Sequence, residues 1–165
     1  MYVNFEIERI YAGWFEVVLY SDDFKIELSA SDAWGNDSPK KFLEILCDLI
    51  MHENIHRYVI WDEEPGIYVI YISKINQTCK LNIFFTENVY EDVGEVTGIL
   101  SYDELQCKFG ELEELLSVDD LYFDYFVKMV VRSFQEYSKG EYREQYEENW
   151  MEFPHEELKK LEQLL

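Results

Sequence analysis

Basic residues are scarce in this chain. Its 165 residues include 14 Lys and Arg against 35 Asp and Glu, so the formal net charge is −21. DNA, RNA and anionic membranes attract proteins mainly through Lys and Arg, so we expect the protein to bind no nucleic acid directly and no membrane. A strongly negative field instead steers a basic protein toward the surface, and we expect a basic protein partner.

Glycine, proline and cysteine are also few, with 7 Gly, 3 Pro and 3 Cys. The glycines form neither G-x-G-x-x-G nor G-x-x-x-x-G-K, the loops with which many nucleotide enzymes hold phosphate. Three cysteines without C-x-x-C spacing give no disulfide framework and no zinc knuckle, which is typical of a reducing compartment. We therefore expect no cofactor.

Long hydrophobic runs are absent. No apolar segment approaches the roughly 20 residues that span a bilayer, and residues 1–10 lack both the basic and the apolar part of a signal peptide. We expect a cytoplasmic location. Hydrophobic residues nevertheless make up 48% of the chain and aromatic residues 17%, which excludes the disordered class. The length suits a single domain of residues 1–165.

The hydrophobic pattern predicts an α+β fold. Alternation of apolar and polar residues predicts six antiparallel strands in two groups of three, at 3–10, 14–20 and 24–30, and at 58–61, 67–73 and 78–85. Between the groups, apolar residues spaced by three and four predict a helix that begins after Ser38 and ends near His52. We therefore expect two antiparallel three-stranded meanders flanking one helix, all within residues 1–85.

The second half of the chain divides into two parts. Residues 86–118 are expected to form an acidic connecting stretch, and residues 119–165 a C-terminal helical segment that closes the domain. Within that segment, residues 121–137 are apolar on nearly every face, which predicts a central, buried helix. Asp119 or Asp120 is the expected N-cap.

Acidic residues concentrate in 87–124, where 12 Asp and Glu accompany a single Lys and give a net charge of −11. Trp and Tyr anchor many protein interfaces because they bury a large area with little loss of rotamer entropy. We therefore expect a binding surface that combines carboxylates with aromatic side chains. The candidates are Glu111, Glu113, Glu114, Asp119, Asp120, Trp34 and Trp61. The alternative for the aromatic residues is an ordinary place in the core.

One short motif matches a catalytic pattern. Residues 52–56 read HENIH, and in H-E-x-x-H two His on one helical face bind zinc while the Glu activates the bound water. Here the helical pattern is already ending, and a strand pattern begins at Tyr58. A zinc-dependent hydrolase, with His52 and His56 as metal ligands and Glu53 as base, is the enzymatic alternative. A structural or small-molecule-binding domain is the other alternative.

A turn and a helical tail give the chain a family resemblance. The turn is Glu64-Pro65-Gly66, and the tail contains Gly140, Tyr142, Trp150 and Phe153-Pro154. In these patterns the chain resembles a group of small acidic bacterial proteins, some of which are toxin-neutralising immunity proteins. The resemblance implies a non-enzymatic acidic binding protein that occludes a basic toxin or nuclease.

Overall fold

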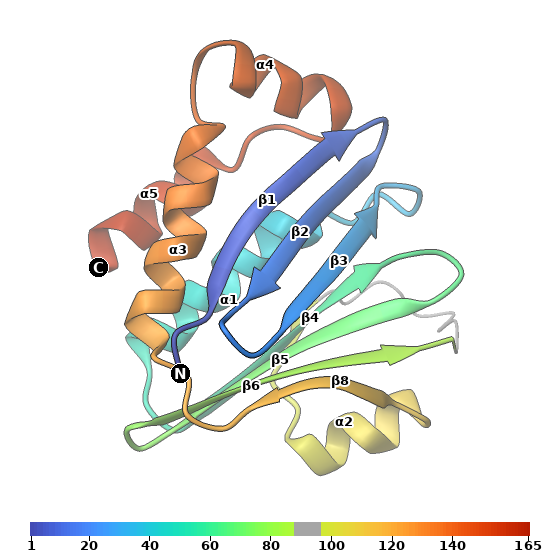
Figure 1. Ribbon diagram of the computed structural model, residues 1–165, viewed down its shortest axis with the longest axis vertical. Coiled ribbons are helices and arrows are strands. Elements are labelled where there is room, and N and C mark those ends of the chain that lie inside the picture. Colours follow the sequence, from blue (N-terminus) through green and yellow to red (C-terminus); the bar gives the residue numbers. More distant parts are fainter. Residues whose placement is uncertain (88–96) are drawn as a thin grey trace.

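The structure is a computed structural model that describes residues 1–87 and 97–165. In these residues the chain forms an α+β fold of two antiparallel sheets and five helices (Figure 1). The elements are β1 (Asn4–Tyr11), β2 (Trp14–Tyr20), β3 (Lys25–Ser31), α1 (Ser38–Met51), β4 (Ile55–Asp62), β5 (Ile67–Ile75), β6 (Thr78–Thr86), β7 (Thr97–Gly98), α2 (Tyr102–Phe109), β8 (Glu113–Val118), α3 (Phe123–Glu136), α4 (Gly140–Asn149) and α5 (His155–Leu164). None of the helices in these ranges is long and apolar enough to cross a membrane.

The predicted α+β class is confirmed, and the sheets extend beyond the two predicted meanders. The first sheet has the order β1-β2-β3, and the second has the order β7-β4-β5-β6-β8. Strands β7 and β8 and helix α2 lie in residues 86–118, which were expected to be only a connection. That expectation was wrong for the described part of the stretch, because β8 extends the second sheet and α2 packs on one of its faces through Tyr102 and Phe109.

The two sheets meet where β3 lies beside β4 (Figure 1). Ser29 and Ser31 of β3 lie 3.5 Å from the carboxylates of Glu63 and Glu64, which follow β4. The hydroxyl of Ser38, at the start of α1, donates a 2.8 Å hydrogen bond to the carbonyl of Ile60 in β4. Helix α1 is thereby fixed to the second sheet directly after the chain leaves the first.

An aromatic core joins both sheets to the helices behind them. It consists of Phe5, Phe15, Phe42, Trp61, Phe126 and Phe134, which all have at most 2% of their surface exposed. Phe15 of β2 contacts the rings of both Trp61 of β4 and Phe134 of α3, at centroid distances of 6.0 and 6.1 Å. Burial of each such side chain contributes roughly 1.5–3 kcal/mol, so this core accounts for a large share of the stability.

Helix α3 is amphipathic, whereas its sequence predicted a central, largely buried helix. Its apolar residues Phe126, Val130 and Phe134 face the core, whereas Lys128 and Arg132 are exposed. The prediction overlooked that the charged residues of the segment fall on one stripe of the helix.

The predicted N-cap of α3 is also wrong. The helix begins after Tyr122 with no capping hydrogen bond from a side chain. Asp119 and Asp120 precede it, and their carboxylates contact Lys80 and the amino group of Met1 instead.

The C-terminal helices close the open ends of the first sheet. Asn149, the last residue of α4, accepts hydrogen bonds from the backbone N–H groups of Ala12 and Gly13 in the β1–β2 turn. The indole N–H of Trp150 donates to the carboxylate of Asp37, the N-cap of α1, at 3.0 Å. Burial raises the pKa of Asp37, and this hydrogen bond opposes the increase. The tail therefore belongs to the same folded unit as the sheets.

We predict that Phe15→Ala lowers the free energy of unfolding by about 3 to 5 kcal/mol, because it leaves a cavity at the contact between the sheets and α3. Urea denaturation followed by tryptophan fluorescence measures the change. Tyr11→Ala is the control, since Tyr11 is 60% exposed on the same sheet, and we expect a change of about 0.5 kcal/mol or less. Equal effects of the two substitutions would contradict the assignment of the core.

Candidate functional site

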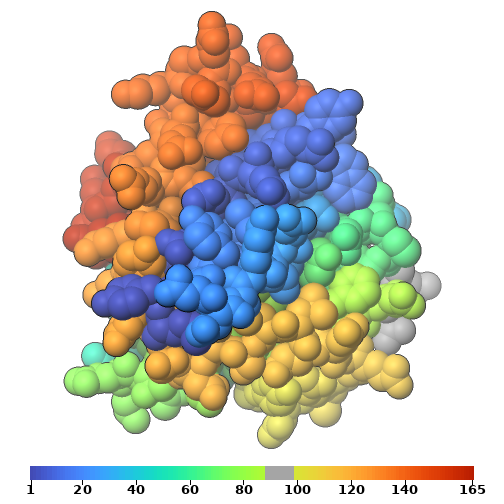
Figure 2. All heavy atoms as spheres, in the orientation of Figure 1, coloured from blue at the N-terminus to red at the C-terminus, as the bar shows by residue number. Residues whose placement is uncertain are grey.

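Strand β8 lies at the edge of the second sheet, and sequence reasoning did not find it. It pairs antiparallel with β6, with Val118 opposite Leu81 and Leu116 opposite Ile83. An irregularity next to Ile83 leaves Leu115 as an extra residue, and its side chain is exposed. On its other side β8 has no strand among the described residues. Figure 2 shows the side chains of β8 and α2 in view below those of the first sheet.

Four carboxylates gather where β8 begins and β6 ends. We call Glu87, Glu111, Glu113 and Glu114 the Glu rim; all four are exposed. Three of them, Glu87, Glu111 and Glu113, line a hollow of about 420 Å³ together with Phe85, Thr86 and Leu112. Glu114 is the next residue of β8 and lies outside this lining. Three of the predicted site residues therefore do lie together. Glu87 was not among the candidates, although its position two residues after the predicted strand 78–85 was a usable signal.

The Glu rim carries negative charge that the described part of the chain does not neutralise. No Lys, Arg or His within residues 1–87 and 97–165 forms an ion pair with any of the four carboxylates. Glu114 accepts one hydrogen bond, 3.3 Å long, from the amide of Asn82. Lys108 of α2 is engaged elsewhere, since its ammonium donates to the hydroxyl of Tyr58 at 3.1 Å. The rim is therefore available to an external cation.

Asp119 and Asp120 lie at the opposite end of β8. The strand has six residues, which separates them from the start of the rim by roughly 20 Å at about 3.3 Å per residue. Asp119 lies 3.3 Å from the ammonium of Lys80, and Asp120 lies 3.6 Å from the amino group of Met1. The predicted acidic surface therefore has two parts. Asp119 and Asp120 already have cationic neighbours, whereas the Glu rim has none among the described residues.

The two predicted tryptophan anchors differ completely in exposure. Trp34 is 61% exposed in the segment between β3 and α1. Trp61 is fully buried in the aromatic core, so its assignment to a binding surface was wrong. The strand pattern around Trp61 gave no indication of its depth, because both faces of the second sheet are covered. One face meets α1 and the other meets α2.

The HENIH motif does not lie on a helix. Helix α1 ends at Met51, His52 is its C-cap with extended backbone angles, and β4 begins at Ile55. The ring of His52 contacts the carbonyl of Asp48 at 3.0 Å, whereas His56 belongs to β4 and stacks near Tyr71. No group of three His, Cys, Asp or Glu suited to a metal ion occurs in the described residues. The shared helical face that this zinc motif requires is thus not formed.

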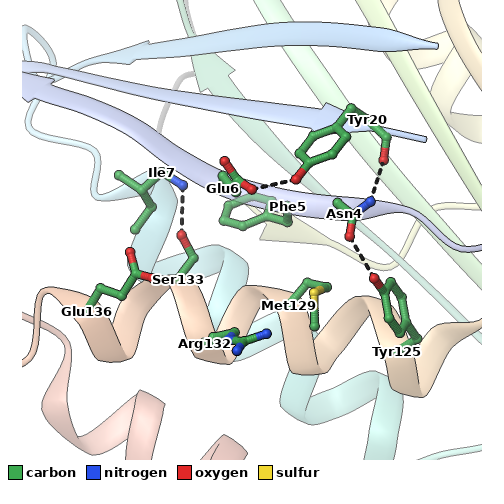
Figure 3. Close-up of a pocket in the computed structure, with 10 residues that line it drawn as sticks. All are labelled: Asn4, Phe5, Glu6, Ile7, Tyr20, Tyr125, Met129, Arg132, Ser133 and Glu136. Carbon is green, nitrogen blue, oxygen red and sulfur yellow. Dashed lines mark hydrogen bonds between the residues drawn. The ribbon is translucent and has the colours of Figure 1, made fainter. Parts of the chain in front are cut away.

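A second hollow, of about 570 Å³, lies between β1 and α3 (Figure 3). Its polar groups are largely satisfied by one another. The hydroxyl of Tyr125 donates to Asn4 at 2.7 Å, the hydroxyl of Tyr20 donates to Glu6, and the backbone N–H of Ile7 donates to Ser133 on α3 at 2.7 Å. The bonds of Tyr125 and Ser133 fasten α3 to the outer edge of β1, and the bond of Tyr20 joins β2 to β1. We interpret this hollow as a structural seam.

The chain matches no protein-family model, no curated protein and no solved structure in the three comparisons that we made.

Two of the three cysteines are not activated nucleophiles. Cys47 and Cys79 are buried, and burial raises the pKa of both thiols, that of Cys79 to about 12. Cys107 of α2 is exposed. A raised pKa keeps a thiol protonated and unreactive at neutral pH.

We predict that one of the three thiols reacts with a chromogenic disulfide reagent at pH 8 in the native protein. The reactive thiol is Cys107, because the two others are both buried and protonated. All three should react after unfolding in urea, and Cys107→Ser should abolish the native reaction. Rapid reaction of Cys47 or Cys79 in the native protein would contradict this assignment.

Proposed function

We propose that this protein is a non-enzymatic acidic binding protein whose Glu rim docks a basic partner protein. The observation that supports the proposal most strongly is the rim itself. Four exposed carboxylates without an ion pair in the described residues lie at an open sheet edge, and three of them, Glu87, Glu111 and Glu113, line a hollow there. On binding, the carboxylates of such an interface lose bound water and their mutual repulsion is relieved, while they gain charge-assisted hydrogen bonds from Lys or Arg.

Charge and shape would contribute differently to such binding. The net charge of −21 attracts a basic partner over a distance set by the ionic strength and raises the association rate. Affinity then depends on desolvated contacts near the centre of the interface. Leu112, which lines the hollow, and Leu115, exposed on β8, are apolar groups placed for such contacts. Ion pairs at the solvent-exposed periphery of an interface mainly affect the association rate and its salt dependence.

The role that we propose is that of a cytoplasmic bacterial immunity protein, which occludes a basic toxin or nuclease. The support for this finer assignment is the sequence resemblance of the turn at Pro65 and of the helical tail, together with the acidic surface. In this mechanism the protein performs no chemistry, and inhibition results from covering the basic surface through which the partner holds its own substrate.

The zinc-hydrolase alternative receives no support from the geometry, since His52 follows the end of α1 and His56 lies in β4. The small-molecule alternative would need a hollow whose polar groups are free. The hollow between β1 and α3 has most of them bonded to each other, so we do not propose either function.

We predict that simultaneous Glu111→Lys, Glu113→Lys and Glu114→Lys substitutions weaken binding of the natural partner by at least about tenfold, since each exposed ion pair is worth roughly 0.2–1 kcal/mol and reversal adds repulsion. The partner is first recovered from source cells with tagged native protein. Affinity is then measured by calorimetry at several salt concentrations. In cells, the native protein should relieve growth inhibition by the partner, and the triple variant should not.

The matched control carries the same change of charge elsewhere. Glu141, Glu144 and Glu148 are exposed on α4, at the end of the molecule far from β8 (Figure 1). Their replacement by Lys should alter affinity much less than the rim variant does. Equal affinity of the native protein and the rim variant, or recovery of an acidic partner, would contradict the proposed function.

A further inference from the structure

The outer edge of β8 is an open hydrogen-bonding edge. The strand is last in the order β7-β4-β5-β6-β8, and five of its six residues, Glu113 to Ser117, are exposed or only partly buried. Half of the backbone N–H and C=O groups of an edge strand point away from the sheet and can pair with an added strand. The edge is therefore a second feature of the same site, independent of the charge of the Glu rim.

The register identifies the outward groups. Strands β5 and β6 are joined by the two-residue turn Asn76-Gln77, so the closing pair, Ile75 and Thr78, exchanges backbone hydrogen bonds. Every second residue of β6 after Thr78 then faces β5, and Asn82 is one of them. Ser117 lies directly opposite Asn82. Since Asn82 directs its backbone groups toward β5, those of Ser117 point away from β6 into solvent.

Two observations agree with this assignment. The carbonyl of Cys79 accepts a 2.9 Å hydrogen bond from the N–H of Leu121, which follows β8. Cys79 and every second residue after it in β6 therefore direct their backbone groups toward β8. The side chains of Ser117 and Asn82 are also within hydrogen-bond distance, at 3.1 Å. Close side chains are typical of an opposed pair without mutual backbone bonds.

We infer that the basic partner docks by adding an extended basic strand to the outer edge of β8. This inference rests on the proposed function and specifies its geometry. Backbone hydrogen bonds to groups such as those of Ser117 would fix the register, while Lys or Arg side chains of the added strand reach Glu113 and Glu114. Charge complementarity favours a basic strand as the occupant, because carboxylates lie at both ends of the β8 edge. Those of the Glu rim form no ion pair with the described residues.

A second copy of the same chain does not fit this edge. Antiparallel pairing of two β8 strands would bring Glu113 and Glu114 of each copy toward Asp119 and Asp120 of the other. Like charges directly across a strand pair are destabilising. Charged side chains on an edge strand are a common protection against such self-association, and here they would admit only a basic strand.

The test compares Ser117→Pro with Ser117→Ala. Both variants lose the hydroxyl that contacts Asn82, but only the proline variant loses the outward N–H. Proline is tolerated on an edge strand where the N–H faces solvent, so the pairing with β6 should persist. The probe is a blocked peptide of alternating Lys and Val, and binding is followed by calorimetry.

We expect the proline variant to bind this peptide about five- to tenfold more weakly than the alanine variant, the effect of losing one backbone hydrogen bond. Unfolding temperatures of both variants show whether the fold persists. A second measurement avoids mutation altogether, because a peptide N-methylated at alternate residues should bind the native protein at least about fivefold more weakly than the unmodified peptide.

Each outcome decides between the two proposals. Equal binding by the proline and alanine variants, or equal binding of methylated and unmodified peptides, would overturn strand addition. In that case the proposed function is still supported if the triple variant Glu111→Lys, Glu113→Lys and Glu114→Lys loses binding of the natural partner. Absence of any binding of the Lys–Val peptide to the native protein would also overturn strand addition, whereas unchanged partner binding by the Lys variant would overturn the proposed function.

Discussion

The aromatic core is the interaction on which the rest of the structure depends. Phe15 contacts Trp61 across the junction of the two sheets. The same two rings also contact the helices, since Phe15 packs on Phe134 of α3 and Trp61 packs on Phe42 of α1. Three antiparallel strands alone would expose one apolar face to water. The two sheets share one set of covering helices, so neither is expected to be stable without the other. That shared core holds β6 in place, and β6 in turn supports β8.

This arrangement explains why acidic residues can be concentrated without unfolding the protein. The carboxylates of the Glu rim stand at the periphery, where water screens their mutual repulsion. One of the few positive side chains, Lys80, meets Asp119 beside the start of α3. The result is an uneven surface, on which the described residues neutralise one end of β8 and leave the other end without an ion pair. A protein that binds a basic partner benefits from this imbalance, since repulsion at the rim is relieved on docking.

Sequence reasoning succeeded where periodicity was strong. The first six strands and α1 follow from alternation and from helical spacing, which sterics and burial impose directly. Strand β8 was missed because its sequence, EELLSV, breaks the period of two. The structure shows the reason, since Leu115 is an extra residue between Glu114 and Leu116, which pair with Phe84 and Ile83, and it shifts the alternation by one position. A local irregularity of this kind depends on the neighbouring strand and leaves no clear pattern in one sequence.

The candidate site was predicted in part for a similar reason. Composition located the acidic stretch, and Glu111, Glu113 and Glu114 do lie together. The burial of Trp61 could not be inferred from the pattern of its strand, because both faces of this sheet are covered and polar residues do not alternate with apolar ones. The competition for Asp119 between capping α3 and pairing with Lys80 depends on a contact between residues 39 positions apart in the sequence.

Hydrogen exchange at Ser117 shows directly whether the partner docks on the outer edge of β8. In the free protein its outward N–H has no described partner on the edge of the sheet, so we expect rapid exchange of this amide. In the complex with the natural partner the account predicts strong protection of this amide and of its neighbours in β8. Unchanged exchange throughout β8, with new protection confined to another surface such as α4, would contradict the account.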